Sequence, residues 1–183
     1  MDQIAERAGY SKGALYWHFE SKEDIFLALL EERIDAPTRS RIELLETAPP
    51  ERDMSVEASR LFAELLGRER ELLLLEHEYW SHAVRDARLR ARYAARRAEM
   101  RAALASALAA RIEHVGTPLP DARLDDVATS IMALAAGLAQ QKLADPDSVP
   151  DELLGNTIVL IYRGLVASGF GTSTSSTGAT TTS

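Results

Sequence analysis

Apolar residues recur along this chain at the three- and four-residue spacing of α-helices, and no segment alternates between apolar and polar residues as a β-strand does. The first helix is expected over residues 2–8, ended by Gly9, which suits the left-handed turn after a helix. Ser11 is a natural cap for a second helix over residues 12–19. The pattern therefore predicts an all-α protein that opens with two short helices.

Longer helices are expected in the rest of the chain. Ser21 and Asp24 belong to a sequence that resembles a capping box and would open the third helix, which Pro37 should bend or end. Further helices are expected near 55–66, over the apolar run 72–84, and over 87–114, 121–144 and 151–168. Residues 171–183 contain Gly, Ser, Thr and Ala alone, so this tail is expected to be disordered.

Composition narrows the class of protein. With 183 residues, of which 46% are hydrophobic, the chain can bury a core in one domain or in a small and a larger one. It contains no cysteine, which excludes a disulfide framework, a thiolate metal site and a cysteine nucleophile. It has neither an apolar run of about 18 residues nor an apolar signal-peptide segment, so a cytoplasmic location is expected.

The formal net charge of −7 argues against a nucleic-acid ligand when it is taken over the whole chain. The first 22 residues are nevertheless neutral, since three acidic and three basic residues cancel there. The acidic excess therefore lies in the rest of the chain. A small DNA-reading segment attached to a larger acidic body is compatible with this distribution.

Residues 9–19, which read Gly-Tyr-Ser-Lys-Gly-Ala-Leu-Tyr-Trp-His-Phe, have the features of a helix-turn-helix motif. A tight turn precedes a short helix whose open face carries aromatic and basic side chains, as in a recognition helix that is presented to DNA. The motif starts close to Met1, where little chain precedes it. A helix that supports such a motif is therefore expected to be missing.

A longer stretch around this motif, residues 2–26, resembles the signature of the TetR family of bacterial transcriptional repressors. Segments 75–80 and 85–90 are also similar to sequences that are frequent in that family. The resemblance implies a helix-turn-helix head, here without its first helix, followed by a helical ligand-binding and dimerisation domain. The implied division is 1–35 for the head and connecting helix, 36–170 for the ligand-binding and dimerisation domain, and 171–183 for the tail.

The resemblance also implies a mechanism. A homodimer would place two recognition helices in successive major grooves of a palindromic operator, and a small-molecule effector in the larger domain would shift the helix leading to the head and release the DNA. The chain is interpreted as a ligand-responsive transcriptional regulator, in the first instance a repressor, whose homodimer forms through about 121–144 and 151–168. Burial within one chain is the alternative for these two helices.

A second hypothesis concerns the whole protein. The chain could be a dimeric small-molecule-binding helical protein whose truncated DNA-binding head is non-functional. No enzymatic activity is expected, because no arrangement of nucleophile and base, phosphate-binding glycine loop or metal-ligand spacing stands out in the sequence.

The candidate DNA contacts lie on and beside the second helix: they are Lys12, Gly13, Ala14, Tyr16, Trp17, His18 and Lys22. At the helix start, Lys12 would donate to guanine and Ala14 would touch a thymine methyl group, while Gly13 permits close approach of the backbone. By resemblance, Tyr16 and His18 would reach phosphates, and Trp17 would lie near base methyls or sugar. Lys22 would clamp a phosphate. The alternatives are that one aromatic residue packs into a small core and that Lys22 is an ordinary solvated lysine.

The candidate effector-binding residues come from helices expected to surround a mostly apolar cavity. They are Phe62, His77, Tyr79, Trp80, Tyr93, Arg97, Met100, Met132 and Gln140. Ordinary core packing is the alternative for all of them. Glu78 and His82 share a helix face, but two ligands without a third are weak evidence for a metal, and no cofactor or metal is expected. The arginine-rich start of the helix over 87–114 is expected to be a solvated face.

Overall fold

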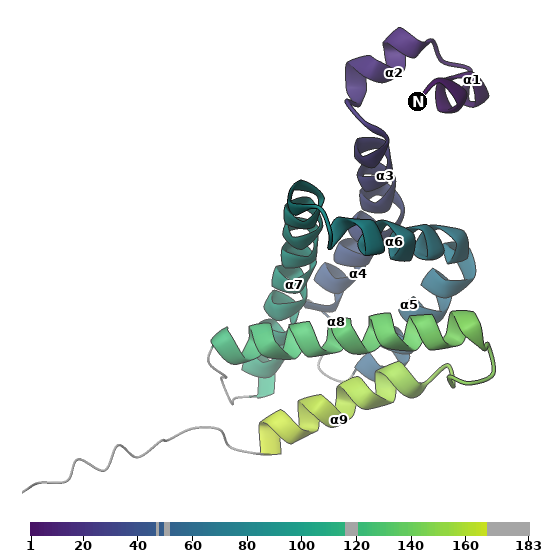
Figure 1. Ribbon diagram of the computed structural model, residues 1–183. Coiled ribbons are helices and arrows are strands. Elements are labelled where there is room, and N and C mark those ends of the chain that lie inside the picture. Colours follow the sequence, from purple (N-terminus) through teal and green to yellow (C-terminus); the bar gives the residue numbers. More distant parts are fainter. Residues whose placement is uncertain (47, 50–51, 116–120, 168–183) are drawn as a thin grey trace, which may run out of the picture.

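The computed structural model describes residues 1–46, 48–49, 52–115 and 121–167, and all regular structure in these ranges is helical (Figure 1). The elements are α1 (Asp2–Ala8), α2 (Lys12–His18), α3 (Lys22–Leu30), the π-helical turn η1 (Glu31–Asp35), α4 (Ala36–Glu46), α5 (Met54–Arg68), α6 (Arg70–Ala83), α7 (Ala87–Val115), α8 (Asp121–Ala144) and α9 (Leu153–Ala167). The predicted all-α class is confirmed. The expected loop over 116–120 and the tail over 171–183 lie outside the described residues.

One continuous helical rod, made of α3, η1 and α4, carries the two short helices α1 and α2 at its upper end (Figure 1). Pro37 was expected to bend or end this helix, and it does not end it, because the helix continues to Glu46. A proline removes one backbone donor and its ring clashes with the carbonyl one turn before it. Directly before Pro37 the chain forms a wider π-turn, in which the N–H of Ala36 donates to the carbonyl of Glu31.

Three apolar clusters hold the larger body together. The first joins α5, α8 and α9 and consists of Phe62, Leu66, Leu138, Val149 and Leu154. The second fixes the rod to α6 through Leu30, Ile34 and Leu72, and the third joins α4 to α7 through Ile42, Met100 and Ala107. In Figure 1, α8 and α9 lie across the bottom of the molecule, and α4 and α7 descend to them. Among the described residues, none of the helices combines the length and apolarity that a membrane crossing requires.

Gly155 determines how closely α5 and α9 approach each other. A Cβ atom at this position would lie 1.9 Å from the carbonyl oxygen of Ser55 and 2.4 Å from the hydroxyl of Ser59. Both distances are far shorter than any contact between non-bonded atoms, so only a residue without a side chain fits here.

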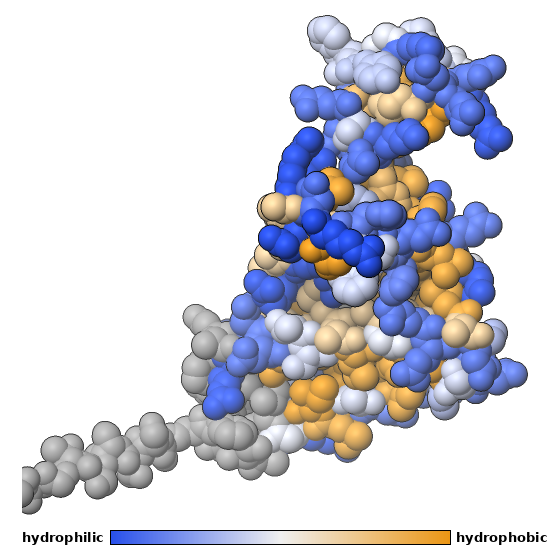
Figure 2. Space-filling view, viewed as in Figure 1, coloured by the Kyte–Doolittle hydropathy of each residue, from blue (hydrophilic) through white to orange (hydrophobic). Residues whose placement is uncertain are grey.

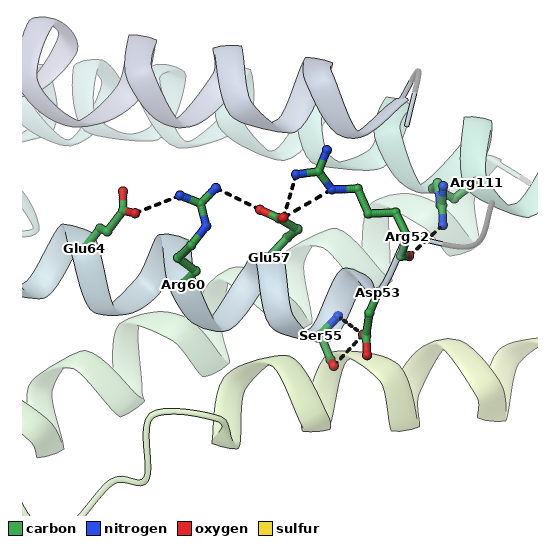
Figure 3. Close-up of polar contacts among 7 residues, drawn as sticks. All are labelled: Arg52, Asp53, Ser55, Glu57, Arg60, Glu64 and Arg111. Atoms are coloured by element: carbon green, nitrogen blue, oxygen red, sulfur yellow. Dashed lines mark hydrogen bonds and ion pairs between the residues drawn. The ribbon is translucent and has the colours of Figure 1, made fainter. Parts of the chain in front are cut away.

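The start of α5 is fixed by polar contacts (Figure 3). Asp53 caps the helix by accepting a hydrogen bond from the N–H of Ser55 at 2.9 Å. A chain of alternating charges then follows the helix with contacts of 2.6–2.9 Å, in the order Arg52, Glu57, Arg60 and Glu64. Arg111 of α7 donates to the carbonyl of Ala48 at 2.9 Å. Exposed ion pairs of this kind contribute little stability each, whereas the hydrogen bond from Arg111 links Ala48 to α7.

A candidate DNA-binding helix and its connection to the body

The turn between α1 and α2 has the geometry that the sequence predicts. Gly9 adopts φ 72°, and its N–H donates to the carbonyl of Glu6 at 3.2 Å. The N–H of Tyr10 donates to the carbonyl of Ala5 at 3.0 Å. These two bonds form a Schellman motif, which ends a helix where glycine can adopt the left-handed conformation. The turn therefore fixes the direction in which α2 leaves α1.

The second helix starts at the expected cap and exposes most of its surface. The hydroxyl of Ser11 accepts a hydrogen bond from the N–H of Ala14 at 3.1 Å. Leu15 and Phe19 are half-buried, and α2 contains no fully buried residue. The helix ends at His18, one residue earlier than predicted.

All seven predicted DNA contacts are exposed, and they lie at neighbouring positions of the helix surface. Three pairs spaced by four residues, Lys12 with Tyr16, Gly13 with Trp17 and Ala14 with His18, share faces of α2, and Lys22 begins α3. Tyr16 is 51% exposed and Trp17 is 85% exposed. An exposed tryptophan on a helix with no buried residue is available to a partner outside the chain. On the face shown in Figure 2, hydrophilic and near-neutral side chains cover most of the head, at the top of the view.

Two features of this surface were missed in the sequence. Tyr10 is 66% exposed in the turn beside α2. The signal available in the sequence was an aromatic residue between two helices that are too short to cover it. Lys12 forms an ion pair with Asp2 of α1, although both side chains remain more than half exposed. The hydrogen bond from Lys12 lowers the pKa of Asp2. A DNA ligand would therefore have to compete with Asp2 for this lysine.

The start of α3 is held to α7 by an ion pair. Ser21 caps α3 by accepting from the N–H of Asp24 at 3.2 Å, and its hydroxyl donates to the Asp24 carboxylate at 2.7 Å. The other carboxylate oxygen of Asp24 lies 2.6 Å from Nη1 of Arg92 in α7. The Ser21 hydrogen bond lowers the pKa of Asp24, and Arg92 lowers it further. The predicted capping box thus also provides the first link between the head and the body.

Aromatic rings lie beside this link. The ring centroids of Phe26 in α3 and Tyr79 in α6 are 5.2 Å apart, and those of Tyr79 and Tyr93 in α7 are 6.2 Å apart. The hydroxyl of Tyr79 is buried without a hydrogen-bond partner among the described residues. Burial raises the pKa of both tyrosines. The contact between the rod, α6 and α7 is therefore apolar beside the ion pair of Asp24 and Arg92.

One turn further along α7, Arg96 joins three elements. It pairs with Asp35 of η1, with Nη2 lying 2.8 Å from Oδ1, and it also pairs with Glu76 of α6. The expectation of a solvated arginine face is wrong here, because the Arg96 side chain is only 10% exposed. Asp35 and Glu76, which are distant in sequence, pair with this arginine and account for its burial. Burial alone would lower the pKa of Arg96, but Glu76 and Asp35 raise it above its ordinary value.

The predicted effector-binding residues fall into separate groups. Phe62 belongs to the cluster between α5, α8 and α9, whereas Met100 and Met132 belong to the cluster between α4 and α7. Tyr79 packs against Phe26 of the rod, and Tyr93 lies beside Tyr79. Arg97 is half-buried in α7. The assignment of these residues to one effector cavity stays a prediction.

Three of the predicted effector residues, His77, Trp80 and Gln140, are connected by the contacts of His77. The rings of His77 and Trp80 stack with centroids 5.7 Å apart, and the Gln140 amide nitrogen in α8 lies 3.2 Å from Nδ1 of His77. Trp80 is 44% exposed. These side chains form a polar and aromatic contact between α6 and α8, and they are open to solvent on one side.

Two surface clefts lie elsewhere. One, of about 210 Å³, separates η1 and α4 from α5, and a neighbouring groove of about 450 Å³ lies beside the α5–α6 corner. Arg33 and Glu69 line both clefts, and neither cleft is lined by a predicted effector residue. Among the described residues, no three histidine or acidic side chains lie close enough together to hold a metal ion.

A helix-turn-helix head that one helical rod connects to a larger helical body defines a class of protein, the transcription regulators that read DNA through such a head. The family model of bacterial regulatory proteins of the tetR family matches residues 1–29, and that of the BetI-type transcriptional repressor C-terminal domain matches residues 51–158. The second match covers more than half of the chain. The chain therefore belongs to the TetR family of transcriptional regulators, which confirms the resemblance seen in the sequence.

Curated relatives have similar segments. The HTH-type transcriptional activator FasR of Mycolicibacterium smegmatis is 33% identical over 81 residues, which cover 43% of this chain and 37% of the relative. An uncharacterized HTH-type transcriptional regulator of Pseudomonas putida, TtgW, is 48% identical over 33 residues, which cover 18% of this chain and 25% of the relative. The matched segments thus span well under half of each relative. No solved structure matches this chain.

Proposed function

We propose that this chain is a ligand-responsive repressor that binds a palindromic operator as a homodimer, with α2 as the recognition helix. The observation that carries the proposal is the exposed surface of α2, in which Trp17 is 85% exposed on a helix without a buried residue. The proposed DNA contacts are the seven residues that the sequence indicated: Lys12, Gly13, Ala14, Tyr16, Trp17, His18 and Lys22. A protein of this kind acts in the bacterial cytoplasm, where the chromosome lies.

The homodimer is proposed to form through α8 and α9. Leu153 and Leu160 of α9 are 38% and 67% exposed, although α9 is one of the most apolar segments of the chain. Figure 2 shows hydrophobic side chains over this lower part of the molecule. Apolar surface of this kind is typical of a two-fold interface between identical chains.

The effector is proposed to contact His77, Trp80 and Gln140 at the contact between α6 and α8. These side chains combine aromatic surface with polar groups, as small-molecule sites usually do. The direction of regulation rests on the match to a BetI-type repressor domain, whereas FasR is described as an activator. A reporter gene placed behind the operator decides between repressor and activator, because a repressor lowers the expression of the reporter and an activator raises it.

The rival hypothesis is a small-molecule-binding protein with a non-functional head. The observation behind it is that Ala5 is the single buried residue in α1 and α2. A head with so small a core has little stability of its own. DNA binding by the chain decides between the two hypotheses.

The test is to capture fragments of the source genome with the purified chain and to footprint the enriched fragments. We expect a protected palindrome, whose binding weakens steeply with salt because phosphate contacts release counterions. Tyr16→Ala should weaken binding to it. Val56→Ala, at an exposed apolar position of α5, is the control and should bind as the unmodified chain does. If no fragment is enriched, the proposal of DNA binding fails and the rival hypothesis stands.

A further inference from the structure

The rod contains a buried charge where its helix changes from the π-turn η1 to the α-helix α4. Asp35, the last residue of η1, is 3% exposed, and it is the single charged residue that is buried in the described part of the chain. Burial raises the pKa of Asp35 above its ordinary value, against the effect of Arg96. An isolated charge in this position would be costly, so its neighbours decide whether the rod is stable there.

Arg96 is the neighbour that compensates this charge. Its guanidinium makes two contacts with the Asp35 carboxylate, through Nε and Nη2, and Nη1 is directed to Glu76 of α6. The planar guanidinium has donors in fixed directions, so it holds two carboxylates in one geometry, which a lysine cannot do. The side chains of Asp35, Arg96 and Glu76 are 5%, 10% and 15% exposed. One side chain of α7 therefore fixes the rod and α6 to each other.

The network lies between the candidate effector contact and the head. On α6, Glu76 faces the rod and α7, whereas His77 and Trp80 lie on the neighbouring face, where His77 meets Gln140 of α8. The rod begins at Lys22, and the short non-helical segment 19–21 connects it to α2 of the head (Figure 1). A displacement of α6 would therefore change the position of Glu76, which shares the guanidinium of Arg96 with Asp35.

We propose that Arg96 is a positioning residue for the DNA-reading head, which it orients by holding Asp35 of the rod and Glu76 of α6 with one guanidinium. The inference rests on the proposed function, since it assigns the network a role in DNA binding. Arg96 contacts no DNA itself. It restricts the angles that the rod takes relative to α6 and α7, and so it restricts where α2 is presented.

The experiment measures the orientation of the head directly. The chain has no cysteine, so spin labels attach only at introduced positions. Glu6→Cys in α1 and Ala102→Cys in α7 place one label on the head and one on the body, both at exposed positions. Labelled chains are mixed with an excess of unlabelled chains, and the distance distribution between the two labels is recorded by pulsed electron paramagnetic resonance.

Three variants disconnect the network at different points. Arg96→Met removes the bridge, Asp35→Asn removes the charge on the rod with little change in shape, and Glu76→Gln removes the charge on α6. The matched control is Arg101→Met, because Arg101 lies in the same helix but pairs with Asp125 of α8 at 3.1 Å. Circular dichroism and thermal unfolding select the variants that fold, and Asp35→Asn replaces Arg96→Met in the comparison if the latter does not fold.

We expect Arg96→Met and Asp35→Asn to broaden the distance distribution, Glu76→Gln to broaden it less, and Arg101→Met to leave it unchanged. Affinity for the captured operator should fall about tenfold in the first two variants, within the usual range of coupling between sites, and should stay within about twofold in the control. A folded Asp35→Asn or Arg96→Met chain whose distribution is as narrow as that of Arg101→Met would overturn the proposal. If the unmodified chain captures no DNA, the proposed function fails, but the label distances still test the role of Arg96.

Discussion

The head and the body of this molecule use their side chains in opposite ways. In α1 and α2 only Ala5 is buried, and the aromatic residues point outward. In the body, three clusters bury aliphatic and aromatic side chains between helices. The head therefore contributes surface, whereas the body and its contacts with the rod contribute the stability. A substitution in the head should change DNA binding without unfolding the chain, and a substitution in one of the three buried clusters should lower the free energy of unfolding.

The largest expected effect comes from the cluster between the rod and α6. Leu30 is 0% exposed there, and Leu30→Ala should lower the free energy of unfolding by about 2–5 kcal/mol, because it removes buried methyl groups and leaves a cavity. Chemical denaturation followed by circular dichroism measures this loss. The control is Leu44→Ala in α4, where the side chain is 67% exposed. An equal loss in both variants would show that the burial of Leu30 is not the source of its contribution to stability.

A smaller loss is expected where α5 and α9 meet. Gly155→Ala places a methyl group against the Ser55 backbone, which is 1.9 Å from the new atom and cannot rotate away. The helices must move apart, at a cost of about 1–3 kcal/mol. The control is Gly67→Ala in α5, where the added atom meets nothing within 4 Å and alanine favours the helix. Thermal unfolding should show a lower midpoint for the first variant only.

A substitution at the DNA-binding surface should weaken DNA binding and leave the free energy of unfolding almost unchanged. Lys22→Ala removes an exposed side chain, so the free energy of unfolding should change by less than about 0.5 kcal/mol. Binding to the captured operator should weaken, and the slope of its salt dependence should decrease by about 1. Fluorescence anisotropy at several salt concentrations measures both quantities. An unchanged slope would mean that Lys22 is an ordinary solvated lysine.

The smallest effect is expected at the border of the two regions, and it depends on pH. Ser21 and Arg92 hold the pKa of Asp24 below its unfolded value. A lowered carboxyl pKa stabilises the fold above the unfolded value and loses this contribution as pH falls through the folded value. Asp24→Asn should therefore be less stable than the unmodified chain near neutral pH, and the two unfolding curves should converge in acid. A constant difference at all pH values would contradict this origin of the stability.

Features determined by a few neighbouring residues could be predicted from the sequence, whereas features determined by distant ones could not. Gly9 ends α1 and Ser11 caps α2 as expected, since each acts on the backbone within four residues of itself. Arg96 has acidic partners 61 and 20 residues away, so a pattern along α7 alone indicated a solvated side chain. The exposure of Trp17 was expected from the family signature, but the partner of Lys12 was not.

The π-turn also sets the rotational phase of the head about the rod. Each residue of an α-helix advances the chain by about 100° around the axis and 1.5 Å along it. The turn at Glu31–Asp35 holds more residues than an α-helical turn does, because Ala36 bonds to Glu31 across five residues. Deleting one residue there would therefore restore a regular helix and leave α2 close to its present direction. If all residues stayed and the turn became α-helical, α2 would face roughly a quarter-turn away, while every contact inside the head stayed the same.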